Sequence, residues 1–502
     1  MKHTSHACSD HHGEGPTVWD LPIPDGLKHE WKDAITRRHF LKKSSASLGG
    51  IGLASLLGSK LAQAGGILGA PHAEPTAKRV ISLFMAGGPP HQDLFDYKPK
   101  LAEYSGKDIP KDVLGADFKP SGMTAGMSRF TVRPSTFTFK QYGESGRYVS
   151  SALPWTSKII DEVSMVHSMY SDAINHEPAI MLMNTANMLP GRPALGAWVS
   201  YGLGSPNDNL PSFIVLNSTQ PKGTSGQPVT PRLWSSAFLN AKHAGVPLRA
   251  GKDPVLYLNN PDGMSRKLRR SILDGISELN QKIYQDTGDR ETHARIQQYE
   301  MAFKMQMSVP ELANLSNEPA STWELYGDEA KIPGSFAYNC LMARRLAERG
   351  VRYTQIYQRG WDFHGALDRD LKKLALATDR PTYALITDLK RRGLLDDTLV
   401  TWGGEFGRTT YSQGGSGRDH HAKCFTSWMA GGGIKPGQTY GQTDDFAFNI
   451  LDTQTKVHPR DFIATICHCL GVNADRLSKR VMGVDLRPTG VIHGKVIKDL
   501  LA

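Results

Sequence analysis

Carboxylates and imidazoles follow several apolar segments of this 502-residue sequence, at the points where those segments end. The apolar run 80–85 leads to Asp93, 351–357 leads to Asp362 and His364, and 398–402 leads to Glu405, with His420 shortly after. In open α/β sheets, ligands bind at the carboxyl ends of the strands. Carboxylates and imidazoles at one such edge are donors for a divalent metal ion. The sequence therefore predicts a hydrolytic metal site.

Asp362 and His364 are two residues apart. Side chains at this spacing on an extended segment point to one face, so both could reach the same metal ion. Glu405 is a further candidate ligand, because the glycines before it allow close approach of the backbone. Arg408 could hold an oxyanion through two parallel hydrogen bonds. A strand-end turn with a Glu405–Arg408 salt bridge is the alternative.

The pair His420-His421 offers one ligand, because adjacent histidines cannot easily bind one metal ion together. We assign His420 as the ligand, while His421 orients it or faces solvent. Asp93, or Asp96 in its place, is expected to hold a second metal ion. A hydrogen-bonded turn would also explain Asp93.

The segment 167–178 ends a predicted strand and begins a predicted helix. A helix N-terminus favours a bound anion or a nucleophile placed beside one. Ser171 is the hydroxyl closest to this end, and we expect it to act in catalysis together with His176 and Arg408. Capping of the helix by Asn175 is the alternative interpretation.

The composition is that of a globular protein, with 39% hydrophobic and 22% charged residues. The net charge is +10, but no dense basic run with interleaved aromatic residues occurs after the first segment of the chain. We therefore expect attraction to anionic substrates and no nucleic-acid binding. The apolar stretch 46–58 is shorter than the roughly 20 residues that a membrane span needs, so no stable span is predicted.

Residues 36–42, T-R-R-H-F-L-K, resemble the twin-arginine export motif. An apolar stretch follows, and Ala64 is a suitable last residue of a cleaved signal. This order predicts export through the twin-arginine translocon to the periplasm or beyond. An amphipathic helix with a chance arginine pair is the alternative. We expect a leader and signal at 1–64, a linker at 65–78 and a single domain at 79–502.

Apolar runs predict strands at 79–85, 164–169, 212–216, 351–357 and 398–402. Helical patterns are expected at 179–187, 335–348, 371–392 and, in a long helical region, at about 265–307. The last of these lies inside an expected insertion at about 218–332. Strands that alternate with helices indicate an α/β fold with a mainly parallel sheet.

These motifs together resemble domain-of-unknown-function family 1501, a sulfatase-like family of exported bacterial proteins in the alkaline-phosphatase-like superfamily. The matching stretches are L-F-M-A-G-G-P at 83–89, D-L-F-D-Y-K-P at 93–99, D-x-x-N-H-x-P-A at 172–179, W-D-x-H at 361–364, W-G-G-E-F-G-R at 402–408, G-R-D-H at 417–420 and A-G-G-G-I-K at 430–435. The resemblance extends from about 36 to 490. It implies a mostly parallel central sheet with helices on both faces.

The resemblance also implies a metal-dependent hydrolase of phosphate or sulfate esters of the two-metal type. Its cofactors would be divalent ions such as Zn, Mn, Mg or Ca, and its substrate an anionic ester such as a sulfated or phosphorylated carbohydrate. The sulfatase motif C-x-P-S-R is missing, so formylglycine chemistry has no residue to act on. Glu405 stands where relatives usually carry Asp. The alternative is a non-catalytic exported binding protein that keeps the fold.

Overall fold

Eight strands form a central sheet in the order β12-β4-β11-β8-β1-β7-β5-β6. β1 pairs in parallel with β7 and β8, β5 with β6 and β7, and β4 with β12, whereas β11 runs antiparallel to β4 and β8. The mainly parallel sheet is therefore confirmed. The strands are β1 (Arg79–Ala86), β4 (Val163–Met169), β5 (Phe213–Asn217), β6 (Val246–Leu248), β7 (Tyr353–Arg359), β8 (Thr398–Gly403), β11 (Phe425–Ala430) and β12 (Thr439–Tyr440).

The computed structural model describes residues 65–502 except 117, 121, 251–253, 256–259, 262 and 289. The described residues belong to one compact unit. The leader and the twin-arginine motif lie outside the described residues. Within the described part of the chain, no helix is both long enough and apolar enough to cross a membrane.

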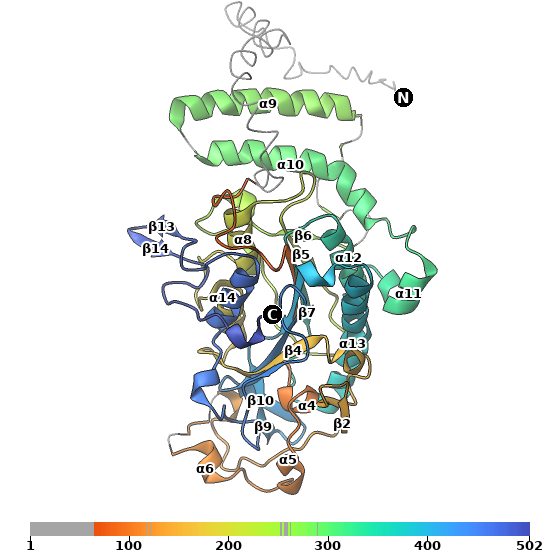
Figure 1. The fold of residues 1–502 in the computed structure, drawn as a ribbon, viewed down its shortest axis with the longest axis vertical. Helices are drawn as coiled ribbons and strands as arrows, with labels where there is room; N and C mark the ends of the chain where they lie inside the picture. The colour runs from red at the N-terminus through yellow and green to blue at the C-terminus, as the bar shows by residue number, and fades with distance from the viewer. Residues whose placement is uncertain are drawn as a thin grey trace, which may run out of the picture. The chain divides into compact units, whose positions relative to one another are not determined.

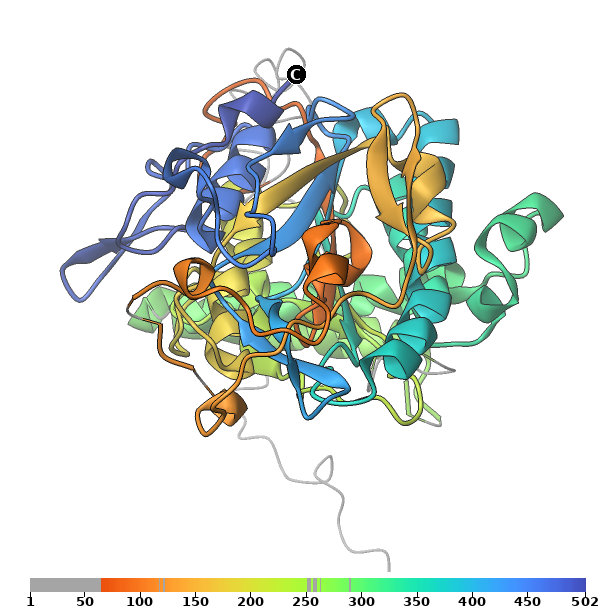
Figure 2. The same ribbon diagram turned by 90° about the horizontal axis from the view of Figure 1, so that it is seen from below.

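Helices cover both faces of the sheet, as predicted (Figures 1 and 2). Alternate residues of a strand point to opposite faces. Accordingly, Ile81, Leu83 and Met85 of β1 join one apolar core, while Val80 and Phe84 join the other. The first core contains α12 (Phe336–Glu348) and α13 (Leu367–Arg391), and the second contains α7 (His176–Thr185), α8 (Leu195–Leu203) and α14 (Pro459–Cys469).

The expected insertion at 218–332 is only partly separate from the sheet. It contains the long helices α9 (Arg266–Thr287) and α10 (Arg290–Ala313), which pack side by side, and the short α11 (Ala320–Tyr326). However, β6 lies in the same stretch and pairs with β5 at the edge of the sheet. The sequence did not suggest β6, because a three-residue strand carries too little pattern.

A two-stranded hairpin that the sequence did not predict lies beside the carboxyl ends of β7 and β8. β9 (Gly407–Gln413) pairs with β10 (Gly417–His421), and Arg408 stands opposite His420. The hairpin packs against α4 (His91–Leu94), which follows β1. The remaining short elements are α5 (Lys100–Glu103), α6 (Lys111–Leu114), the hairpin β2 (Phe139–Tyr142) and β3 (Arg147–Ser150), and the hairpin β13 (Lys479–Val481) and β14 (Val484–Leu486).

Candidate metal centre

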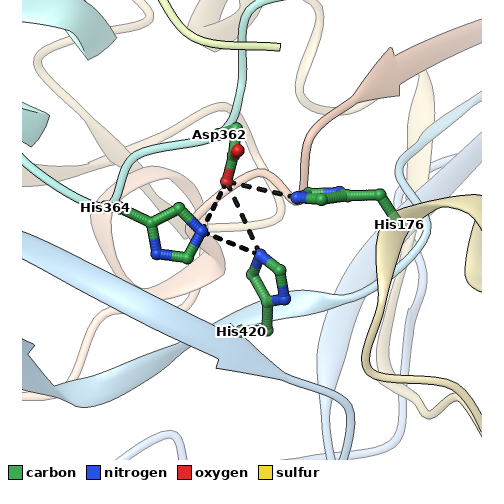
Figure 3. Close-up of side chains that lie close together, drawn as sticks. All are labelled: His176, Asp362, His364 and His420. Carbon is green, nitrogen blue, oxygen red and sulfur yellow. Dashed lines mark hydrogen bonds and ion pairs between the residues drawn. The ribbon is translucent and has the colours of Figure 1, made fainter. Parts of the chain in front are cut away.

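Four side chains converge at the carboxyl end of the sheet: His176, Asp362, His364 and His420 (Figure 3). One donor atom from each lies within 4.8 Å of the others. Oδ1 of Asp362 is 2.9 Å from Nε2 of His364, 3.2 Å from Nε2 of His176 and 3.5 Å from Nε2 of His420. The predicted ligands Asp362, His364 and His420 are therefore brought together, and His176 joins them.

Three different elements deliver these residues. Asp362 and His364 lie in the loop between β7 and α13, His420 lies in β10, and His176 is the first residue of α7. The loop after β7 approaches the end of β1 very closely at Gly87. A Cβ added to Gly87 would lie 2.5 Å from the backbone of Trp361, and Gly87 has a φ of +128°. Only glycine fits this position. The close contact therefore fixes the position of the loop that carries Asp362.

The Nδ1 atom of each histidine is held by an oxygen outside the cluster. His364 Nδ1 lies 2.6 Å from Oε1 of Gln413, His420 Nδ1 lies 2.7 Å from the carbonyl of Ile174, and His176 Nδ1 lies 2.6 Å from Oε1 of Glu405. These oxygens accept hydrogen bonds, so each Nδ1 carries the proton and donates it. In a neutral imidazole held in this way, Nε2 presents its lone pair to the centre of the cluster. This is the arrangement that orients histidines toward a metal ion.

The charges around the cluster favour a cation in its centre. Burial would lower the pKa of His176, but the neighbouring carboxylates of Asp362 and Glu405 outweigh it and raise the pKa to about 9. Burial would raise the pKa of Asp362, yet the surrounding imidazoles and Arg408 hold it well below its usual range. Nε2 of His364 and Nε2 of His420 face each other at 3.0 Å. A bound cation, or a proton carried by one of the two rings, would separate two lone pairs at that distance.

The donor set fits a zinc-type ion. Zinc–nitrogen bonds of about 2.0–2.1 Å in a tetrahedron place the donor atoms about 3.3 Å apart, and the distances from Asp362 Oδ1 range from 2.9 to 3.5 Å. Nε2 of His176 is buried and has no hydrogen-bond partner in the structure. Three imidazoles suit Zn, Fe, Cu or Ni, whereas Mg and Ca prefer sets of oxygen ligands. The donors therefore favour a zinc-type ion over the Mg or Ca that the resemblance allowed.

Arg408 does not have the role that the sequence suggested. Its side chain is fully buried. Nη2 donates to Asp362 Oδ1 at 2.6 Å and also to the carbonyl of Gly87, and Nε donates to the carbonyl of Gly88 at 3.0 Å. A guanidinium enclosed in this way cannot reach the oxyanion of a substrate. Arg408 instead holds the carboxylate of Asp362 in place.

Glu405 lies beside the cluster and is not one of its four donors. Its carboxylate is fully buried and accepts hydrogen bonds from His176 and from the backbone N–H of Gly87, at 2.9 Å to Oε1 and 3.1 Å to Oε2. Both oxygens are therefore already in use. Glu405 orients His176, and this contact takes the place of the predicted ligand bond.

Asp93 lies outside the cluster and is not placed to hold the second metal ion that the sequence predicted. Its carboxylate forms a fully buried ion pair with Arg418, with Nε 2.8 Å from Oδ2 and Nη2 3.2 Å from Oδ1. The alternative ligand Asp96 pairs with Lys98 at 3.1 Å. Among the described residues, one group of His, Cys, Asp and Glu has the spacing of a metal site.

The side chains of Ser171 and His421 have partners other than the four donors. The hydroxyl of Ser171 accepts a hydrogen bond from the N–H of Ala173 at 3.2 Å, as in a tight turn. Nε2 of His421 lies 2.7 Å from the carbonyl of Phe448. Asn175 occupies the N-cap position of α7, but its side chain makes no capping hydrogen bond.

The sequence reasoning missed two features of the site. His176 was expected to act in catalysis, yet it lies among the donors. Its place directly after a strand-to-helix loop was the available signal, since that loop starts at the same edge of the sheet. Gln413 was not singled out, because its contact with His364 depends on the unpredicted β9–β10 hairpin.

A family model described as "Protein of unknown function (DUF1501)" matches residues 77–501. The chain belongs to this family, which confirms the resemblance found in its motifs. No curated protein matches the sequence.

Several solved structures are similar to this chain at low identity. A phosphonate monoester hydrolase from Silicibacter pomeroyi has a TM-score of 0.34 and 11% identity, over 69% of this chain and 71% of that chain. The lipoteichoic acid synthase LtaP from Listeria monocytogenes has 0.32 and 8%, over 82% and 76%. The PsFucS1 sulfatase from Pseudoalteromonas sp. has 0.32 and 12%, over 87% and 75%.

Proposed function

We propose that this chain is a hydrolase of phosphate or sulfate esters that works with one zinc-type ion, held by His176, Asp362, His364 and His420. The observation that carries the proposal is the orientation of the histidines. All three donate Nδ1–H to an outer oxygen and turn Nε2 toward Asp362. The sequence resemblance to the alkaline-phosphatase-like superfamily and the net charge of +10 support an anionic substrate.

A divalent ion held by His176, Asp362, His364 and His420 would polarise an ester oxygen and would lower the pKa of a water molecule so that it could act as a nucleophile. The side chains of His364 and His420 are 22% and 13% exposed, so a substrate reaches the centre from their side. Phe406 is fully buried and packs against the rings of His176 and His420 at 5.0 and 4.5 Å. It keeps water away from another side of the cluster.

A second candidate is a non-catalytic binding protein with a structural metal ion. Structural zinc sites have four protein ligands, whereas catalytic ones leave a position open. Here four protein donors converge. The hydroxyl of Ser171, the predicted nucleophile, is used in a turn.

Metal analysis combined with an ester panel tests both candidates. We expect about one zinc-type ion per chain and hydrolysis of 4-nitrophenyl phosphate or sulfate that a chelator abolishes. His364→Ala should lose metal and turnover together, while His493→Ala, at a histidine whose side chain is 67% exposed, should keep both. Bound metal without hydrolysis of either ester would favour the binding protein. Purified protein that takes up no metal and hydrolyses nothing would contradict both.

We also propose that the chain is exported by the twin-arginine route. Arg37 and Arg38 in the motif T-R-R-H-F-L-K support this proposal. Replacing both by Lys should retain the protein in the cytoplasm, because the translocon reads the arginine pair. Lys42→Arg serves as a control outside the pair. Unchanged export of the double variant would count against the route.

A further inference from the structure

A hollow of about 370 Å³ shares no lining residue with the metal centre. It lies between the end of the β2–β3 hairpin, strand β4 and the segments 95–98 and 439–443. Small-molecule sites commonly measure about 300–1,000 Å³. This cleft, which we call the β4 cleft, therefore has the size of a small ligand site.

Arg147 is held rigidly at the β4 cleft. Its Nε donates to Oγ1 of Thr439 at 3.0 Å, and its Nη1 donates to the carbonyls of Ile160 and Val163 at 3.1 and 2.8 Å. None of these bonds uses Nη2. A guanidinium fixed by three hydrogen bonds loses little freedom when it binds an anion, and its Nη2 keeps two N–H groups that donate to a sulfate, phosphate or carboxylate.

The other polar groups of the β4 cleft largely satisfy one another. Nζ of Lys98 lies 3.1 Å from Asp96 Oδ1 and donates to the carbonyl of Thr443 at 3.0 Å, while Thr443 Oγ1 donates to Asp96 Oδ2. Burial lowers the pKa of His167 to about 4, so this imidazole is neutral. Its Nδ1 contacts Oγ1 of Thr426 at 2.9 Å, which leaves Nε2 for a hydroxyl. Arg147 is therefore the cation that remains for a ligand.

Aromatic rings form one wall of the β4 cleft. The ring centroids of Tyr97 and Tyr148 lie 4.8 Å apart, and Tyr97 stacks on Phe139 at 4.9 Å. Tyr97 is 37% exposed and Tyr148 is 42% exposed. Tyrosines have few rotatable bonds and combine an apolar face with a polar tip. Their exposed rings beside polar groups suit a sugar, which has an apolar ring face and many hydroxyls.

We propose that the β4 cleft binds a sugar carrying one anionic substituent, with the anion on Arg147 and the sugar ring against Tyr97 and Tyr148. The cleft acts as a binding site and not as a catalytic one. The inference goes beyond the proposed hydrolase, because it needs no metal ion and holds whether or not the metal centre is catalytic.

Calorimetric titration of the full chain with glucose 6-sulfate, glucose and inorganic sulfate tests the proposal. We expect glucose 6-sulfate to bind most tightly. Arg147→Gln should weaken its binding about tenfold or more, the value of a hydrogen bond to a charged group, and should leave glucose unaffected. Tyr148→Ala, at an exposed position that folding tolerates, should weaken both sugars about three- to tenfold.

Two matched variants separate the β4 cleft from general charge and from the metal centre. Lys140→Gln removes one positive charge from the exposed side of β2 in the same hairpin and should change nothing. His364→Ala should lose metal but keep sugar binding. Sulfate that binds as tightly as glucose 6-sulfate, equal losses in Arg147→Gln and Lys140→Gln, or no binding of any probe at millimolar concentration would each overturn the proposal.

Discussion

Asp362 and Asp93 are two buried carboxylates beside the same β9–β10 hairpin, and each is paired with an arginine of that hairpin. Arg418 contacts both oxygens of Asp93. Arg408 contacts Oδ1 of Asp362, and three imidazole nitrogens surround the same oxygen. Asp93 is therefore neutralised in an ion pair with Arg418, whereas Asp362 lies at the centre of a set of candidate metal ligands.

The difference shows that burial and charge alone do not identify a metal ligand. Both carboxylates are at most 6% exposed. What distinguishes Asp362 is that three imidazoles, each bonded elsewhere through Nδ1, turn Nε2 toward it. Imidazole nitrogens gathered around a carboxylate form a set of metal ligands, which a cation would complete. An arginine that binds both oxygens of a carboxylate already neutralises it.

The largest expected effect tests the ion-pair side of this comparison. Asp93→Asn leaves Arg418 as a buried charge without its partner, which should lower the free energy of unfolding by about 3–5 kcal/mol. The folded protein should still bind its metal ion. Urea unfolding measures the free energy of unfolding, and elemental analysis measures the metal content. If Asp93→Asn loses metal and keeps its stability, the roles of the two carboxylates are reversed.

The next effect tests the donor side. His364 is partly exposed, so His364→Ala should change the stability of the metal-free protein by less than about 1 kcal/mol. Metal affinity should fall by more than about 100-fold, beyond the 10–100-fold typical of an outer-shell residue. Competition with a coloured zinc chelator measures this affinity. A variant that binds zinc like the unaltered protein would remove His364 from the donor set.

Much of this site could be predicted from local pattern. Apolar runs gave β1, β7 and β8, and the carboxyl ends of parallel strands bring Asp362 and His364 to one edge. The spacing of two residues also predicted that these two side chains act together, as their 2.9 Å contact indicates.

The pairing of arginines could not be predicted in this way. Arg408 and Arg418 both follow a glycine, and both stand near acidic candidates in the sequence. Which carboxylate each one meets depends on the register of β9 and β10 and on contacts across 325 residues between Asp93 and Arg418. Local periodicity contains no information about such contacts, so Asp93 and Arg408 received roles that the packing does not allow.

A smaller effect is expected at the oxygen that orients His364. Gln413→Leu removes the acceptor for Nδ1, which lies 2.6 Å from Oε1, so the ring loses its fixed tautomer. Metal affinity should fall by about 10–100-fold. Gln454→Leu, at an exposed glutamine away from the hairpin, should leave it unchanged. Equal affinities in both variants would show that the Gln413 contact does not orient the ligand.

The smallest effect is expected at Ser171. Its hydroxyl accepts one hydrogen bond, from the N–H of Ala173 at 3.2 Å, and the loss of such a bond costs about 0.5–1.5 kcal/mol. Ser171→Ala should therefore keep its metal ion and its turnover within about twofold, since the hydroxyl serves a turn. Ser157→Ala, at another buried serine that bonds a nearby backbone carbonyl, is the matched control. Metal content and turnover, measured on the same preparation, decide whether Ser171 acts as the nucleophile. Retained metal with abolished turnover in Ser171→Ala alone would restore the serine as nucleophile, and the cluster would then serve to activate it.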